Sequence, residues 1–197
     1  MATKRLQDQI RFIIEIDKEK NILRQTHISG FTRQENDAEH AWHMATMVYL
    51  LKEYANEEID LAKTMMMALI HDVVEIDAGD AYAYDTQALA TQKEKEERAA
   101  QRIFGLLPDD QRDELLALFE EFEKGETAEA KFAKAMDNFQ PLLLNDSNNG
   151  GDWRQHGVCK TQVQNRQIRT KGGAEEIWKH TQALIEKNVK KGNIKDE

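Results

Sequence analysis

Residues able to bind a metal or move a proton gather around one histidine–aspartate pair. His71 and Asp72 end an apolar helical stretch, Glu75 comes three residues after the pair, and Asp80 closes the segment. A buried ion costs several kcal/mol unless it is paired or bound to a metal. Because these residues stand where the sequence otherwise resembles a protein core, their charge should be compensated. We interpret the compensating group as a divalent cation.

Two more candidate ligands lie on the interior faces of other expected helices. His40 shares the apolar stripe of a helix expected at residues 38–55, and Asp137 lies within the stripe of a later helix. Alone, each is typical of a buried hydrogen-bonded side chain, and a lone His-Asp dipeptide is a weak signal. Together, two imidazoles and two carboxylates favour one divalent ion among Mn, Co, Fe, Ni, Zn and Mg over Ca. An octahedral ion would keep two positions for water and a substrate oxygen.

Helical periodicity accounts for most of the chain, and strand-type alternation is nearly absent. Asn36 and Glu39 predict a capping box, and Asn56 and Thr127 are expected caps of later helices. Few residues join the second and third helices, which predicts an antiparallel pair with His40 near the His-Asp pair. Helices are expected at residues 3–20, 38–55, 58–72, 86–104, 108–125, 128–144, 161–168 and 174–189, with loops at 22–30 and 145–157.

Composition excludes several classes of protein. A chain of 197 residues with two prolines is expected to form one all-α domain. The single Cys159 suits a reducing compartment, and residues 1–20 lack the features of a signal peptide. No stretch approaches the roughly 20 apolar residues that cross a bilayer, so we expect a cytoplasmic protein without a membrane partner. The net charge of −9 argues against binding to duplex nucleic acid.

A set of short motifs extends over about residues 10–145. It comprises Arg33-x-Glu35-Asn36-x-x-Glu39-His40, His71-Asp72-x-x-Glu75, Gly79-Asp80, Ala128-Glu129-Ala130-Lys131-Phe132 and Asp137. This set resembles the HD-domain metal-dependent phosphohydrolases, in particular the branch of bacterial 5'-deoxynucleotidases and human HD-domain-containing protein 2. Residues 145–165 are similar to a bacterial subgroup of uncharacterised HD hydrolases.

The resemblance implies an HD-domain helical bundle with a C-terminal helical extension. Residues 1–197 would form a single HD domain, with a core at about 10–145 and a C-terminal loop and helices at 146–190. His40, His71, Asp72 and Asp137 would be the metal ligands.

The resemblance also implies roles for the remaining site residues. Glu75 would act as a general acid or base toward the attacking water or the leaving group. Asp80 would hold a sugar hydroxyl or assist Glu75. Arg24 would bind the phosphate, which suits a guanidinium, and Arg33 is its rival. The aromatic loop at Tyr82–Tyr84 could stack a base or pack as a surface lid.

The implied activity is hydrolysis of (deoxy)nucleoside 5'-monophosphates to nucleoside and phosphate. Two alternatives stay open: a phosphodiesterase or nucleotide triphosphohydrolase with the same fold, and a non-catalytic metal- or nucleotide-binding module. Intact Glu75 and Asp80 argue against the module. HD proteins with two or three metals need further histidines before the last aspartate, and residues 73–155 contain none, so we expect a single ion. Relatives of this branch imply a homodimer and a small phosphorylated substrate.

Overall fold

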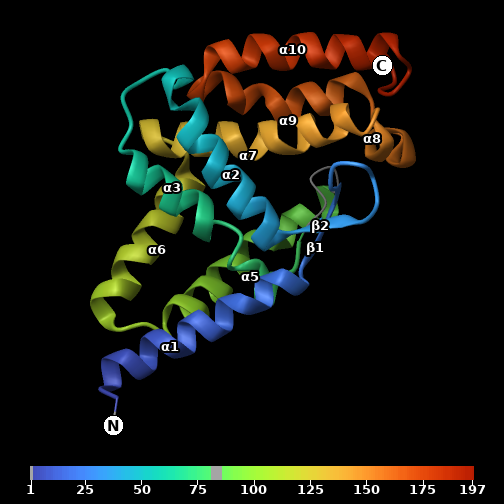
Figure 1. The fold of residues 1–197 in the computed structure, drawn as a ribbon. Helices are drawn as coiled ribbons and strands as arrows, with labels where there is room; N and C mark the ends of the chain where they lie inside the picture. Colours follow the sequence, from blue (N-terminus) through green and yellow to red (C-terminus); the bar gives the residue numbers. More distant parts are fainter. Residues whose placement is uncertain (1, 81–85) are drawn as a thin grey trace.

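The chain folds into helices that lie in two groups around two hydrophobic clusters (Figure 1). The structure is a computed structural model, and it describes residues 2–80 and 86–197, of which residues 86–91 are described by their backbone. The aromatic loop at Tyr82–Tyr84 lies outside the described residues. The helices are α1 (Lys4–Ile16), α2 (Asp37–Leu51), α3 (Leu61–Ile70), α4 (Glu75–Ala78), α5 (Thr86–Phe104), α6 (Asp109–Lys124), α7 (Ala128–Ser147), α8 (Gly151–His156), α9 (Lys160–Gly173) and α10 (Glu175–Lys190).

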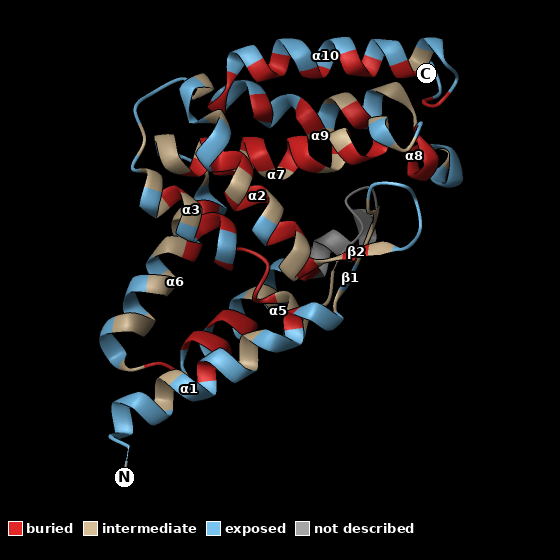
Figure 2. Ribbon diagram, viewed as in Figure 1, coloured by how far each residue is buried: buried red, intermediate tan, exposed pale blue. Residues whose placement is uncertain are grey.

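The larger hydrophobic cluster joins α2, α3 and α7 to the C-terminal helices α9 and α10, which stack along α7 at the top of Figure 1. The smaller cluster joins α1, α5 and α6 to Val73 and Val74. Figure 2 shows the buried faces of both groups turned inward. Helix α3 contributes Ala68 to the larger cluster and Ile70 to the smaller one, and Val73 and Val74 also belong to the smaller cluster. The His-Asp pair therefore stands where the chain passes from one cluster to the other.

Local signals in the sequence predicted most helix starts correctly. The Asn36 side chain accepts from the backbone of Glu39 while the Glu39 carboxylate accepts from the backbone of Asn36, so the expected capping box opens α2. Thr127 caps α7 as expected, and Gly125 ends α6 with a left-handed backbone. The first helix is shorter than expected, because α1 ends at Ile16 and a 3-10 segment follows at Asp17–Asn21.

Two expectations about the backbone of residues 22–60 were wrong. The loop expected at residues 22–30 contains β1 (Leu23–His27), which pairs with β2 (Gln34–Asn36) in an antiparallel sheet. This strand is polar on both faces, so it shows no period-two pattern. Asn56 does not cap α3, because Asp60 does; the Asn56 side chain instead donates to the carbonyls of Lys171 and Gly172 and accepts from the backbone of Glu175.

The loop expected at residues 145–157 is largely helical. Helix α7 continues to Ser147, and α8 follows between two glycines in the left-handed conformation, Gly150 and Gly157. Helix α9 also runs past residue 168 to Gly173. A Cβ atom at Gly173 would lie 2.2 Å from the carbonyl oxygen of Lys131, so glycine permits close packing of α9 on α7 at the residue where α9 ends. Within the described part of the chain, no helix is long and apolar enough to span a bilayer.

Candidate metal and active site

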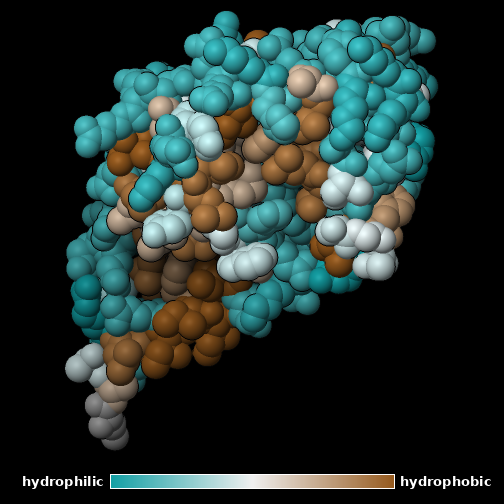
Figure 3. Space-filling view, turned by 45° about the horizontal axis from the view of Figure 1, so that its top comes forward, coloured by the Kyte–Doolittle hydropathy of each residue, from teal (hydrophilic) through white to brown (hydrophobic). Residues whose placement is uncertain are grey.

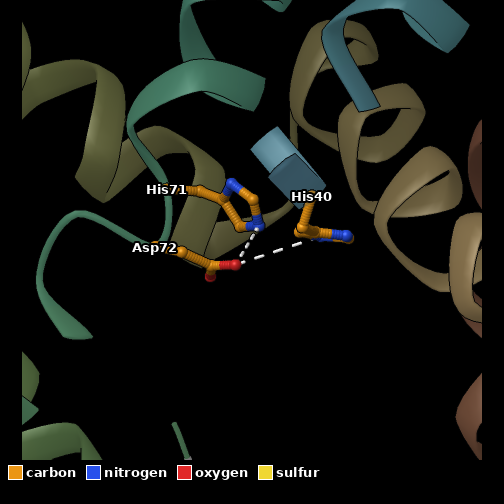
Figure 4. A group of neighbouring side chains, drawn as sticks. All are labelled: His40, His71 and Asp72. Atoms are coloured by element: carbon orange, nitrogen blue, oxygen red, sulfur yellow. Dashed lines mark ion pairs between the residues drawn. The ribbon is translucent and has the colours of Figure 1, made fainter. Parts of the chain in front are cut away.

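Four candidate ligands meet between the two hydrophobic clusters, and we call His40, His71, Asp72 and Asp137 the ligand cluster. His40 lies in the first turns of α2, His71 and Asp72 directly follow α3, and Asp137 lies in the middle of α7. Figure 4 shows the two imidazoles and the Asp72 carboxylate turned toward one another. One ligand atom from each of His40, His71 and Asp72 lies within 4.8 Å of the others.

Asp137 approaches the same point from α7. Its Oδ1 lies 3.4 Å from His40 Nε2 and 3.9 Å from His71 Nε2. On the other side, Asp72 Oδ2 lies 3.1 Å from His71 Nε2 and 3.9 Å from His40 Nε2. The expected proximity of His40 to the His-Asp pair is therefore present. Asp137, which lies 97 positions after His40 in the sequence, also contacts the Nε2 atoms of His40 and His71.

The outer nitrogen of each imidazole is held by an oxygen acceptor. His71 Nδ1 donates to the carbonyl oxygen of Ala68 at 3.0 Å, and His40 Nδ1 donates to Gln140 Oε1 at 3.1 Å. Gln140 is fully buried, and its Nε2 donates to Glu35 Oε1 at 2.6 Å. Such outer contacts orient a metal-binding histidine and keep the lone pair on its other nitrogen. Both Nε2 atoms then face the centre of the cluster.

The residues of the ligand cluster fit a divalent cation. His40 Nε2 and His71 Nε2 are buried and have no hydrogen-bond partner among the described residues. Buried polar atoms in native proteins are nearly always satisfied. Two unsatisfied imidazole nitrogens that face two carboxylates provide the mixed nitrogen and oxygen donor set of a transition-metal site.

Positive charge already balances the carboxylates of the cluster. Burial lowers the pKa of His71, but the adjacent Asp72 charge outweighs it and the pKa rises to about 9. Burial raises the pKa of Asp72, and the charges of His71 and Arg24 lower it further than burial raises it. Burial lowers the pKa of His40 to about 4. His71 and Arg24 therefore carry positive charge beside these carboxylates at neutral pH, and a cation bound by the ligand cluster would displace the proton from His71 Nε2.

Glu75 and Asp80 lie beside the ligand cluster and line the same cavity. Burial, followed by the charges of Asp72, Asp37 and Asp80, raises the pKa of Glu75 to about 12. Glu75 shares a hydrogen bond with the buried Asp37, while its Oε2 has no partner among the described residues. Burial also raises the pKa of Asp80, which accepts from the backbone of Gln25. Glu75 thus presents an uncommitted carboxyl oxygen next to the cluster.

The two candidate phosphate-binding arginines differ in position. Arg24 on β1 lines the cavity, and its Nη1 lies 2.6 Å from Asp72 Oδ2 and 3.4 Å from Asp37 Oδ1. Arg33 does not line it: its half-exposed guanidinium donates to both carboxylate oxygens of Glu39 at 2.6 and 2.8 Å. The structure thus brings Arg24 to the site and leaves Arg33 at the surface.

The cavity beside the cluster has a volume of about 270 Å³. Its acidic side lies on the α3–α4 segment and its far wall is built from α7 and α9, including Lys134, Arg166 and Arg169. Carboxylates outnumber cationic groups among its lining residues. This volume is at the lower end of the range for small-molecule sites.

Sequence reasoning missed the residues that surround the cluster. Gln140 follows Asp137 by three positions on the same helix face, a spacing that could have suggested it. Arg166 and Arg169 left no such signal, because they lie beyond the motifs and reach the site only through packing of α9 on α7. His43 also enters the network, since its Nδ1 lies 3.1 Å from Gln140 Nε2.

Known proteins resemble this chain in both sequence and structure. The sequence profile of the HD domain family matches residues 16–178. The chain belongs to the HD domain family. A crystal structure described as a predicted metal-dependent phosphohydrolase from Magnetospirillum magnetotacticum MS-1 is 46% identical, with a TM-score of 0.93, over 97% of this chain and 96% of that chain. An HD-domain phosphohydrolase from Listeria innocua shares the fold at 19% identity, with a TM-score of 0.60 over 92% of this chain and 85% of that one.

Curated relatives are similar over a shorter stretch. The 5'-deoxynucleotidase HDDC2 of Homo sapiens is 34% identical over 111 residues, which is 56% of this chain and 53% of that protein. The 5'-deoxynucleotidase hdd1 of Schizosaccharomyces pombe is 27% identical over 117 residues, 57% of this chain and 58% of its own length. The chain spans about half the length of the curated relatives it matches. The expected all-α HD-domain fold is confirmed.

Proposed function

We propose that this HD-family protein is a metal-dependent phosphomonoesterase that hydrolyses (deoxy)nucleoside 5'-monophosphates. The observation that carries the proposal is the pair of buried Nε2 atoms without partners, which face Asp72 and Asp137 beside a cavity. The 5'-deoxynucleotidase names of the curated relatives support this substrate. The 46% identical structure supports a metal-dependent phosphohydrolase.

We propose His40, His71, Asp72 and Asp137 as the ligands of one divalent ion among Mn, Co, Fe, Ni, Zn and Mg. Within the described residues, His40, His71 and Asp72 form the one group of three or more such side chains at metal-binding spacing. Asp137 Oδ1 lies 3.4 Å and 3.9 Å from the Nε2 atoms of His40 and His71. When bound, the ion would acidify a water molecule and polarise a phosphate oxygen.

The chain's own groups would position the substrate and move the proton. Arg24 reaches the cavity and would donate to the phosphate oxygens, a geometry that guanidinium groups favour. Water adds its oxygen to phosphorus, the bond from phosphorus to the 5' oxygen breaks, and the water's proton ends on that oxygen. Glu75 would carry this proton, because its Oε2 has no partner among the described residues. Asp80 would accept from a sugar hydroxyl or support Glu75.

Cavity size and charge favour a monophosphate over a triphosphate. A volume of about 270 Å³ leaves little room for a longer polyphosphate chain. The cavity also has few cationic side chains to neutralise the higher charge of a triphosphate.

The proposal is tested with purified protein loaded in turn with Mn²⁺, Co²⁺, Ni²⁺, Zn²⁺ and Mg²⁺. Deoxynucleoside 5'-monophosphates, the matching triphosphates and a phosphodiester are supplied, and released phosphate and pyrophosphate are measured. We expect phosphate from the monophosphates. Failure to release phosphate with every ion would refute the proposal, and release of pyrophosphate from triphosphates would favour the alternative.

We also propose that the protein is a cytoplasmic homodimer. Large hydrophobic side chains are exposed on α1, α2 and α3, among them Ile13, Ile14 and Trp42 at 61%, 65% and 67%. Figure 3 shows hydrophobic surface gathered near the N-terminal end of the chain. Apolar patches of this kind mark interaction surfaces. Sedimentation equilibrium of the wild type and an Ile13→Glu/Ile14→Glu variant tests this, and a monomeric wild type would refute it.

A further inference from the structure

Helix α9 contributes two arginines to the cavity from outside the segment that carries the HD motifs. Arg166 and Arg169 are one helical turn apart, and both line the cavity. Arg166 Nη2 lies 3.7 Å from Asp137 Oδ2, the carboxylate oxygen on the side away from the imidazoles. We call these two residues the α9 wall.

Arg166 faces fewer carboxylates than Arg24 does. Arg24 is buried, and Asp72, Asp37 and Glu35 surround its guanidinium. Within the described part of the chain, Asp137 is the sole ion-pair partner of Arg166, and Arg169 has none. The Arg166 side chain is 35% exposed. A guanidinium has five N–H donors in a planar fork, so Arg166 keeps donors that can face a ligand in the cavity.

Packing fixes the position of the α9 wall. Gln167, next to Arg166, is buried and its Nε2 donates to the carbonyl oxygen of Asn138 on α7 at 2.6 Å. Gly173, at the C-terminal end of α9, allows a close approach to Lys131 of α7. Because Asn138 follows Asp137 directly, these contacts hold α9 at a set register beside a ligand-cluster residue.

We propose that Arg166 is a substrate-binding residue that donates to the phosphate, with Arg169 as a weaker second donor. This rests on the proposed function, which it deepens. Asp137 lies between the imidazole nitrogens and Arg166, so a phosphate beside a cation in the ligand cluster lies within reach of Arg166. A terminal phosphomonoester has three non-bridging oxygens, enough for a cation, Arg24 and Arg166 together. A diester has two, and the α9 wall therefore selects monoesters.

The test separates phosphate binding from turnover. Arg166→Gln, Arg166→Lys and Lys171→Gln are each made in a Glu75→Gln background, which stops turnover, and the proteins are loaded with Co²⁺. Lys171→Gln is the matched control, because this substitution removes a positive charge from an exposed position of α9 that does not line the cavity. Calorimetry then measures binding of inorganic phosphate and thymidine 5'-monophosphate, and elemental analysis measures bound Co²⁺.

We expect Arg166→Gln to weaken binding of both ligands by about tenfold to a hundredfold, which is the range for a charge-assisted hydrogen bond. Bound Co²⁺ should not change. Arg166→Lys, which keeps the charge and loses the fork, should be intermediate, and Lys171→Gln should match the background protein. When Arg166→Gln is made alone, with Glu75 intact, KM for the monophosphate should rise more than kcat falls relative to the wild type.

Two results would overturn the inference. One is unchanged phosphate affinity in Arg166→Gln. The other is a loss of bound Co²⁺ with unchanged phosphate affinity per loaded site, which would make Arg166 a residue that positions Asp137. Absence of monophosphate turnover in the wild type would refute the proposed function alone, because phosphate binding in the Glu75→Gln proteins is measured independently of turnover.

Discussion

The two sides of the cavity differ in burial and in charge. In the ligand cluster, His40 is fully buried, Asp72 contacts Arg24, and both imidazoles are held by outer hydrogen bonds. In the α9 wall, Arg166 is partly exposed and has one ion-pair partner among the described residues, at 3.7 Å. The cluster is preorganised around the Nε2 atoms of His40 and His71, which can accept a cation. The wall instead presents guanidinium N–H groups, which can donate to an anion.

The ligand cluster is suited to bind a cation, and the α9 wall is suited to bind an anion. Burial makes an unpaired charge costly, so removal of one member of the cluster leaves its neighbours uncompensated. Removing the partner of an exposed arginine costs less free energy, because water takes the place of the lost partner. Substitutions in the cluster should therefore affect cation binding strongly, and substitutions in the wall should affect anion binding moderately.

Asp137→Asn should have the largest effect. It replaces a carboxylate that faces both imidazoles with a neutral amide of the same size. We expect bound Co²⁺ to be lost and turnover to fall by about a thousandfold or more, as is typical for removal of a group essential to chemistry. Elemental analysis and phosphate release measure both, and Asp113→Asn on exposed α6 is the control. Full metal content in Asp137→Asn would show that Asp137 is not a metal ligand.

Glu75→Gln should separate metal binding from proton transfer. Turnover should fall by about a hundredfold to ten-thousandfold, the range for a general acid or base, while the bound Co²⁺ stays constant. Asp77→Asn is the matched control, since Asp77 lies on the same short helix and pairs with Arg102 outside the cavity. Turnover that equals the wild type in Glu75→Gln would show that another group moves the proton.

Gln140→Leu should weaken the metal site without removing a ligand. The Gln140 side chain accepts from His40 Nδ1, and leucine cannot replace that contact. We expect Co²⁺ affinity to fall by about tenfold to a hundredfold, the range for an outer contact to a metal ligand. Competition titration with a chelating dye measures the affinity. An unchanged affinity would mean that packing alone orients His40.

Glu19→Gln should have the smallest effect on activity and a measurable effect on stability. Glu19 is buried, Oε1 has no partner among the described residues, and burial raises its pKa from 4.5 to about 7. Because the unfolded state ionises first, the wild type loses stability as pH rises from about 4.5 to 7, and the loss persists above pH 7.

Glutamine cannot ionise, so the Glu19→Gln variant should be more stable than the wild type by about 1–3 kcal/mol at pH 8 and similar at pH 4. Urea unfolding at both pH values measures this difference. Exposed Glu53→Gln is the control, and it should change neither value. Equal stability of Glu19→Gln and wild type at pH 8 would show that Glu19 ionises freely in the folded protein.

Most helices and several of their caps could be predicted from the sequence, because they depend on residues that are adjacent in the chain. The capping box at Asn36 and Glu39, the cap at Thr127 and the end of α6 at Gly125 each involve residues within one turn. The polar strand β1 and the helical residues near Asn145 could not be read in this way. Strand β1 pairs with β2, and the backbone of His27 in β1 donates to Asp152 of α8, so these segments are shaped by partners outside themselves.

The order of residues along the chain was enough to predict that His40, the His-Asp pair and Asp137 face the interior from three segments, since helical periodicity assigns a residue to a face. The groups that surround them were fixed by how the helices pack. It brought Arg24 into the cavity and left Arg33 with Glu39, placed Gln140 against His40, and set the α9 wall beside Asp137. The physical reason is sequence distance: these contacts join residues whose separation no local pattern encodes, so packing of whole helices selects them.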